Sequence, residues 1–331
     1  MDGHADHSGQ IRRTLGTNCL RRALLRTIAC ASLILIPGLL FAADDSSTSE
    51  QGTALPLWEA IAKGFIEGMT EYLPVSSTGH LLIFDHWMGR DPFAPETEAS
   101  DALTICIQSG AILAVILLYF QRLRQMVSGL LGGDPAGRRL FIELVIAFLP
   151  AAVVGLLFHK IVKEHLFKIV PVTIAIFTGA ILILAMPRPH KMATPPVEKE
   201  LTDLRWHESL MIGIFQCLAF WPGFSRSLAT ILGSRVMKLK MDAAVEFSFL
   251  LGLITLGAAT AKEAVSDGSK IVEYYGVMSP LLAVIVAFVS AIISVKFMVG
   301  VLNRFGLVPF AIYRLVLAGF CVVLWRKQFF G

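Results

Sequence analysis

The chain has 331 residues, of which 55% are hydrophobic and only 16% are charged, and its mean hydropathy is +0.67. Soluble domains carry about 25% charged residues, so this composition excludes an ordinary soluble domain and indicates an integral α-helical membrane protein. The net charge of +4 is small, and no basic stripe with interleaved aromatics indicates nucleic acid. The five cysteines form no CxxC pair, so neither a metal–thiolate site nor a disulfide framework is predicted.

Residues 1–55 predict a targeting segment that ends in a polar linker. Several arginines precede an apolar run from Ile28 to Leu40, and the small residues of FAADDSS follow it. A cleaved signal peptide and an uncleaved anchor both fit this pattern, and both place residue 45 outside. The rest is expected to form a single membrane domain at 56–330, with repeat one at 56–187, a cytoplasmic linker at 188–206 and repeat two at 207–326.

Six apolar stretches have the length of membrane-spanning helices: roughly 103–120, 140–158, 169–187, 243–262, 279–301 and 310–325. Two further pairs, 57–72 with 78–88 and 207–220 with 227–236, are too short to cross about 30 Å of hydrocarbon, and each pair turns at a proline. Such segments predict re-entrant hairpins, which are tolerated where protein or a wet cavity surrounds them. The predicted fold is an all-α integral membrane protein with six transmembrane helices plus two re-entrant helical hairpins.

Loop charges predict the orientation of these spans. Arginine- and lysine-rich loops follow the first span and the second hairpin, whereas acidic residues precede the first span. Counting from an external residue 45 places the basic loops inside and the acidic loops outside, as the positive-inside rule expects. The fit is imperfect, because Lys160, Lys163 and Lys168 fall in an outside loop.

The two hairpins are similar in sequence, which predicts an internal repeat. Matching pairs lie at an offset of 149 residues, or 148 after one deletion: Glu59 and Glu208, Gly64 and Gly213, Glu67 and Gln216, Pro74 and Pro222, Ser77 and Ser225. Three spans follow each hairpin, and an odd number makes the halves inverted. We therefore expect an inverted-topology repeat in which the hairpin tips meet near mid-membrane and form the site.

Two carboxylates of the first hairpin, Glu67 and Glu71, are four residues apart and share one helix face. They repel each other in a low dielectric, so a divalent cation, a shared proton or an arginine is expected between them. Mg²⁺ or Ca²⁺ would take carboxylate oxygens and leave coordination positions open for phosphate. An ordinary pair on a solvated helix face is the alternative, and the apolar neighbours Ile66 and Tyr72 argue against it.

The turn after these carboxylates is rich in hydroxyl groups. Pro74 ends the first arm, and Ser76, Ser77 and Thr78 then present hydroxyls and backbone N–H groups at a helix start, where the dipole favours phosphate. Helix capping explains one such hydroxyl but not three. His80 follows within one turn of Ser77 and is expected to take a proton or to attack phosphorus itself, although a buried core histidine is the commoner role.

Arg226 lies in the second hairpin, within PGFSRS, and has no charged neighbour in sequence. A buried arginine needs an anion, which Glu67, Glu71 or a bidentate phosphate would supply. An anchor at the inner membrane surface is the alternative. The hydroxyls on the same short arm are expected to donate to phosphate, and they belong to Ser225, Ser227 and Thr230.

Two stretches, EGMTEYLPVSSTGH and PGFSRSLAT, resemble the signatures of the bacitracin-resistance-type undecaprenyl-diphosphate phosphatase family, (E/Q)xxxE with PxSSTGH and PGxSRSxxT. The resemblance covers residues 56–330. It implies a bacterial inner-membrane enzyme, open to the outside, that hydrolyses undecaprenyl diphosphate with Mg²⁺ or Ca²⁺, recycles the carrier lipid for peptidoglycan synthesis and confers bacitracin resistance. The implied active-site positions are Glu67, Glu71, Ser76, Ser77, Thr78, His80, Ser225, Arg226 and Thr230.

These expectations combine into one enzymatic mechanism, and two other functions are considered as alternatives. Glu67 and Glu71 are expected to hold the ion, Arg226 to bind the diphosphate, and Ser77, His80 or water to attack phosphorus. A lipid-phosphate transporter or flippase is the rival, because inverted repeats are transporter architecture. A non-catalytic lipid-binding subunit would leave the His–Ser–Glu cluster unexplained. The expected partners are the polyprenyl diphosphate substrate and membrane lipid, and a homodimer is left open.

Overall fold

The computed structural model describes residues 55–88, 98–186 and 197–330. Within these ranges the chain is helical apart from short turns and one isolated bridge between Lys199 and Leu239, so the all-α class is confirmed. The targeting segment expected at 1–55 lies outside the described residues except for Leu55. Residues 188–196 of the expected cytoplasmic linker also lie outside them.

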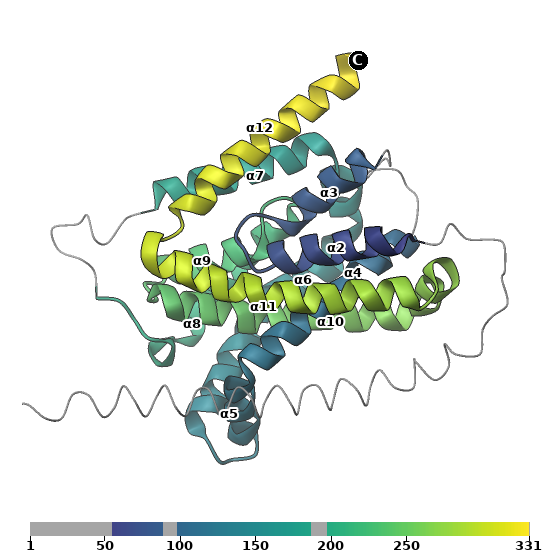
Figure 1. The fold of residues 1–331 in the computed structure, drawn as a ribbon. Helices are drawn as coiled ribbons and strands as arrows, with labels where there is room; N and C mark the ends of the chain where they lie inside the picture. Colours follow the sequence, from purple (N-terminus) through teal and green to yellow (C-terminus); the bar gives the residue numbers. More distant parts are fainter. Residues whose placement is uncertain (1–54, 89–97, 187–196, 331) are drawn as a thin grey trace, which may run out of the picture.

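In each half two short helices form the hairpin, α2 with α3 and α8 with α9, and most of the helices that follow are longer (Figure 1). The first half contains α2 (Leu57–Thr70), α3 (Ser77–Trp87), α4 (Glu98–Leu118), α5 (Phe120–Leu130), α6 (Pro135–Leu166) and α7 (Ile169–Ala185). The second half contains η2 (Leu201–Asp203), α8 (Trp206–Gln216), η3 (Cys217–Phe220), α9 (Arg226–Val236), α10 (Met241–Tyr275), α11 (Met278–Phe305) and α12 (Val308–Phe330).

Three of the described helices contain stretches long and apolar enough to cross a membrane: Pro135–Phe158, Met241–Ser266 and Met278–Phe305. A fourth span arises if α4 and α5, which are bent by 77° at Tyr119, are taken together. The apolar parts of α7 and α12 are shorter helices. The structure thus supports a multi-pass helical membrane protein, in which α4 covers nearly all of the span expected at 103–120 and the unexpected bend lies at its end.

Each hairpin packs on a helix of the other half. α2 lies along α11, whereas α8 lies along α6 (Figure 1). The matching glycines lie at these contacts: a Cβ on Gly64 would lie 2.3 Å from the carbonyl oxygen of Ala283, and one on Gly213 would lie 2.3 Å from that of Ala147. Only glycine permits backbones to approach so closely. The two halves therefore exchange equivalent contacts, as repeated halves would.

The two hairpin turns also share an unusual backbone. Ser76 and Ser225 have positive φ angles of 78° and 79°, and each hydroxyl accepts a hydrogen bond from a backbone N–H three residues later, that of Gly79 and Leu228 respectively. The capping serines of the two hairpins are therefore equivalent, and they lie 149 residues apart in the sequence. The expected match of Ser77 with Ser225 is wrong, because eight residues separate Glu67 from Ser76 and eight separate Gln216 from Ser225, so the expected deletion is absent.

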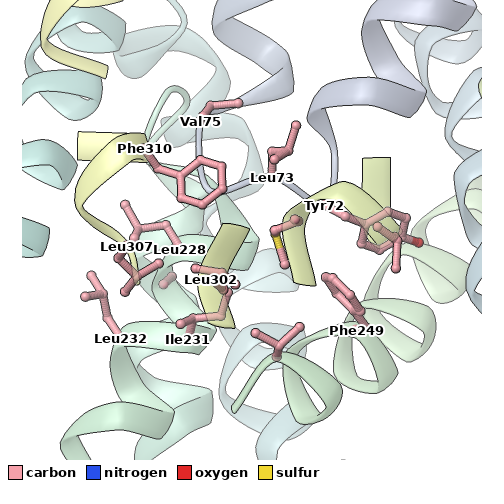
Figure 2. Close-up of a cluster of buried hydrophobic side chains, with 14 of the residues drawn as sticks. Tyr72, Leu73, Val75, Leu228, Ile231, Leu232, Phe249, Leu302, Leu307 and Phe310 are labelled. Carbon is pink, nitrogen blue, oxygen red and sulfur yellow. The ribbon is translucent and has the colours of Figure 1, made fainter. Parts of the chain in front are cut away.

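An apolar core joins the two turns. Side chains of the first turn pack against α9, with further contributions from α10, α11 and the start of α12 (Figure 2). This packing keeps the hairpin tips together and excludes water on one side of the polar residues. The labelled members are Tyr72, Leu73, Val75, Leu228, Ile231, Leu232, Phe249, Leu302, Leu307 and Phe310.

Candidate active site

Glu71 and Ser77 form a hydrogen-bonded pair across the first turn. Glu71 directly follows α2, Ser77 is the first residue of α3, and the Ser77 hydroxyl donates to Oε2 of Glu71 across 2.7 Å. Both residues are buried. A hydroxyl within reach of a carboxylate is the arrangement of a nucleophile beside its general base.

Arg226 reaches the same carboxylate from the second turn. Its Nη2 donates to Oε1 of Glu71 across 3.2 Å, and its Nη1 donates to the carbonyl of Ser248 across 3.1 Å. The guanidinium lies 5.7 Å from the centre of the Tyr72 ring, and its Nε has no hydrogen-bond partner in the described part of the chain. The side chains of the ion pair are only 8% and 7% exposed. Burying such a pair is costly, so a functional reason is expected.

Glu67 lies one turn before Glu71 on α2 and is 1% exposed. Neither of its carboxylate oxygens has a hydrogen-bond partner among the described residues. A buried carboxylate without a partner is expensive, so a cation or a proton is needed there. The donor set fits Mg²⁺ or Ca²⁺, although no group of three or more His, Cys, Asp or Glu residues that could hold a metal is found in the described ranges.

His80 is held away from the Ser77 hydroxyl. Its Nδ1 lies 2.7 Å from the carbonyl oxygen of Ser76, and its Nε2 lies 2.5 Å from the hydroxyl of Tyr313 on α12, with the two rings stacked. A carbonyl only accepts, so Nδ1 carries a proton, and Nε2 of the neutral ring accepts from Tyr313. The hydrogen-bond partner of the Ser77 hydroxyl is Glu71, whereas the two ring nitrogens of His80 bond to Ser76 and Tyr313.

The hydroxyls of the second hairpin bind protein groups. Ser225 and Ser227 donate to the carbonyl of Leu73, across 3.5 and 3.0 Å. Thr230 is fully buried, and its hydroxyl contacts the carbonyl of Arg226 at 3.0 Å. These contacts fix the start of α9 against the first turn, close to the groups that they were expected to assist.

The remaining candidates begin α3. The hydroxyl of Ser76 caps the helix, as described above, and Ser76 is 3% exposed. Thr78 is partly exposed on the first turn of the same helix. The structure therefore brings Glu71, Ser77 and Arg226 into direct contact, places Glu67 one turn away, and surrounds them with capping hydroxyls.

Sequence reasoning missed two groups near the site. Lys63 is buried on α2 and pairs with Asp85 of α3 across 2.7 Å, which ties the two arms of the first hairpin together. From α12, Tyr313 reaches His80 on α3 and Arg314 reaches the first turn at Pro74. The signal available for Arg314 was an arginine within an apolar span, which is rare without a function.

Comparisons with known proteins show what this chain is similar to. A family model described as bacitracin resistance protein BacA matches residues 60–320. The chain is 40% identical to an undecaprenyl-diphosphatase of Sorangium cellulosum (strain So ce56), over 81% of this chain and 85% of that protein. It is 41% identical to an undecaprenyl-diphosphatase of Maridesulfovibrio salexigens, over 81% and 98%, and 37% identical to one of Neisseria meningitidis serogroup C, over 81% and 94%.

Proposed function

The chain belongs to the bacitracin resistance protein BacA family, and from this membership we infer that it hydrolyses undecaprenyl diphosphate to undecaprenyl phosphate and inorganic phosphate. It is a membrane enzyme that recycles the carrier lipid for peptidoglycan synthesis, and bacitracin resistance fits the family name. The observation that carries the chemistry is the contact of one buried carboxylate, Glu71, with both Ser77 and Arg226.

We propose Ser77 as the nucleophile, in preference to His80 or water. Its Oγ attacks the terminal phosphorus while its proton passes to Glu71, and the bond from phosphorus to the bridging oxygen breaks, which releases undecaprenyl phosphate. Glu71 returns this proton to the departing phosphate oxygen and is a carboxylate again. A water molecule then attacks the phosphoserine, its proton passes through Glu71 to Oγ of Ser77, and the bond from phosphorus to Oγ breaks to release inorganic phosphate. The hydrogen bond from Ser77 to Glu71 supports this order. His80 already bonds Ser76 and Tyr313 through its two nitrogens.

Arg226 is proposed to hold the diphosphate and to stabilise the charge that develops during transfer. Phosphoryl transfer depends mainly on positioning and charge neutralisation, which a planar guanidinium supplies. The N-termini of α3 and α9 add backbone N–H donors. Ser76, Thr78, Ser225, Ser227 and Thr230 remain proposed substrate contacts, and the hydroxyls now bound to protein carbonyls would have to exchange acceptors to reach phosphate.

Mg²⁺ or Ca²⁺ is proposed to bind Glu67 and Glu71. The unpartnered oxygens of Glu67 support this assignment, and the repulsion between two carboxylates one turn apart favours a cation between them. When bound, such an ion would neutralise phosphate charge. Glu71 already accepts hydrogen bonds from Ser77 and Arg226. Glu67 has no such partner among the described residues, so its negative charge depends on the ion for stabilisation.

The finer topology is also a proposal. We assign six spans, with α7 and α12 completing the set, and two re-entrant hairpins that enter from opposite sides of the inner membrane. The equivalent contacts of Gly64 and Gly213 support an inverted repeat. The loop charges support a site that opens to the outside. A polyprenyl tail would then lie along the lipid-facing surface.

A lipid-phosphate transporter or flippase is the second candidate, favoured by the exchanged hairpins. Phosphate release from undecaprenyl diphosphate by the purified protein in detergent, with and without a chelator, separates the two functions. The enzyme releases phosphate, whereas a pure carrier releases none. Rapid acid quenching then identifies the nucleophile, because phosphoserine survives acid and phosphohistidine does not. An acid-stable label on Ser77 supports the proposed order, whereas a label that is lost in acid, survives an alkaline quench and lies on His80 would overturn it.

A further inference from the structure

Arg314 of α12 is the largest fully buried side chain of the described residues, with 0% of its surface exposed. Neither an ordinary core position nor an anchor at the membrane surface explains an arginine there. In the part of the chain that the structure describes, no carboxylate forms an ion pair with it. Because a buried cation is expensive, its contacts should reveal what it does.

Among the described residues, all of its hydrogen bonds go to backbone carbonyl groups. Nε donates to Ile176 across 3.1 Å and Nη2 donates to Ala175 across 3.1 Å, both on α7. Nη1 donates to Pro74 across 3.3 Å, and Nη2 also donates to Gly223 across 3.0 Å. One planar guanidinium therefore joins α7 to the first hairpin turn and to the second.

The two turn carbonyls lie at equivalent places beside the site. Pro74 lies two residues before Ser76, and Gly223 lies two residues before Ser225, so Arg314 holds each turn just ahead of its capping serine. Ser77 and Arg226 follow those serines directly. The spacing of the two turns sets the distance between the pair formed by Ser77 with Glu71 and the guanidinium of Arg226.

The surroundings of Arg314 are shaped for this side chain. A Cβ on Gly179 of α7 would lie 2.3 Å from Nη2 and 2.7 Å from Cζ of Arg314. Any larger residue at position 179 would displace the guanidinium, since ordinary contacts begin near 3.4 Å. Lysine would keep the charge, but it cannot present the planar fork that reaches three elements at once.

We propose that Arg314 is a positioning residue that clamps the two hairpin turns to α7 and to each other, and so sets the alignment of Ser77, Glu71 and Arg226. The proposal rests on the proposed function for its effect on catalysis, but the clamp itself does not. Arg314 does not touch the reacting atoms, because its hydrogen bonds go to carbonyl groups. Loss of the clamp should therefore lower kcat by a larger factor than it raises KM.

The test compares Arg314→Lys and Arg314→Met with Arg304→Met, which removes an exposed arginine of α11. Misplacement of reacting groups by about 1 Å costs on the order of 100-fold, so we expect kcat to fall about 100-fold in both Arg314 variants and to stay normal in the control. Hydrogen exchange of peptides covering residues 71–78 and 221–226, followed by mass spectrometry, should speed up in the Arg314 variants alone.

Wild-type kcat and exchange in Arg314→Lys would overturn the clamp, because charge alone would then suffice. If Arg314→Met does not fold, Gly179→Ala replaces it, with Gly319→Ala of α12 as the control that adds the same methyl group in open space. Normal kcat and exchange in Gly179→Ala would also overturn the clamp. Absence of phosphate release by the wild-type protein would count against the proposed function, while the exchange measurement still judges the clamp.

Discussion

The carboxylate of Glu71 and the guanidinium of Arg226 meet across 3.2 Å although they come from opposite halves of the chain. Glu71 directly follows α2 and Arg226 begins α9, so the contact forms only when the two hairpins pack together. Their contact joins the two halves of the chain at the proposed reaction site. It also places the positive charge where a transferring phosphoryl group would need it.

Replacement of Arg226 should remove most of the charge stabilisation. We expect Arg226→Ala to lower kcat by roughly 10³- to 10⁵-fold, the range found for arginines that neutralise a transferring phosphoryl group. Because the change leaves Glu71 buried without its cation, thermal unfolding should be measured beside phosphate release. Arg226→Lys keeps the charge and serves as the folded comparison, and Arg304→Ala is the surface control. Near-normal turnover in a folded Arg226→Ala protein would remove Arg226 from the mechanism.

Gly252 of α10 leaves the space that the Arg226 guanidinium occupies. A Cβ there would lie 2.1 Å from Nη1, so Gly252→Ala must push the guanidinium by about 1 Å away from its present place. We expect kcat to fall about 10- to 100-fold, since such displacements are costly in active sites. Gly257→Ala is the matched control, because Gly257 lies on the same helix and a Cβ added there would contact nothing within 4 Å. Equal kcat in the two variants would show that the position of Arg226 is not critical.

Glu67 should determine metal affinity. Glu67→Gln removes the charge of an unpartnered buried carboxylate, so we expect the Mg²⁺ or Ca²⁺ concentration for half-maximal activity to rise at least 10-fold. Calorimetric titration of the metal without substrate gives an independent reading. Glu59→Gln makes the same change two turns earlier on α2 and should leave metal binding unaltered. An unchanged metal requirement in Glu67→Gln would argue against ligation by this carboxylate.

Local sequence signals were sufficient for much of the fold. The hairpin arms predicted at 57–72 and 78–88 correspond to α2 and α3, because Pro74 and the serine caps act over a few residues. The bend at Tyr119 was not predicted, since neither proline nor glycine marks it. The match of Ser76 with Ser225 became visible only when the φ angles of the two serines were compared.

The site was predicted less completely than the fold, for a physical reason. Spacing along a helix places Glu67 and Glu71 on one face, but it does not say which of them binds Ser77 or Arg226. The assignment of His80 to Ser77 rested on such spacing, whereas Tyr313, far away in sequence, provides the actual partner. Contacts between halves depend on tertiary packing, which a single sequence does not encode in any local pattern.

Tyr313 should act through His80, and this coupling can be measured. The hydroxyl of Tyr313 lies 2.5 Å from Nε2 of His80, and the rings stack, so Tyr313→Phe removes one hydrogen bond and keeps the ring. A neutral hydrogen bond contributes about 0.5–1.5 kcal/mol, so kcat should fall roughly 3- to 10-fold. Tyr274→Phe, at another partly exposed tyrosine on α10, is the matched control.

A double-mutant cycle separates this role from a general loss of packing. If Tyr313 acts by orienting His80, Tyr313→Phe should have no further effect on kcat in a His80→Ala background, because the partner is already gone. Nitrogen NMR of histidine-labelled protein should show a changed Nε2 signal for His80 in Tyr313→Phe but not in Tyr274→Phe. Fully additive losses of kcat, together with an unchanged His80 signal, would show that the hydroxyl of Tyr313 acts independently of the histidine.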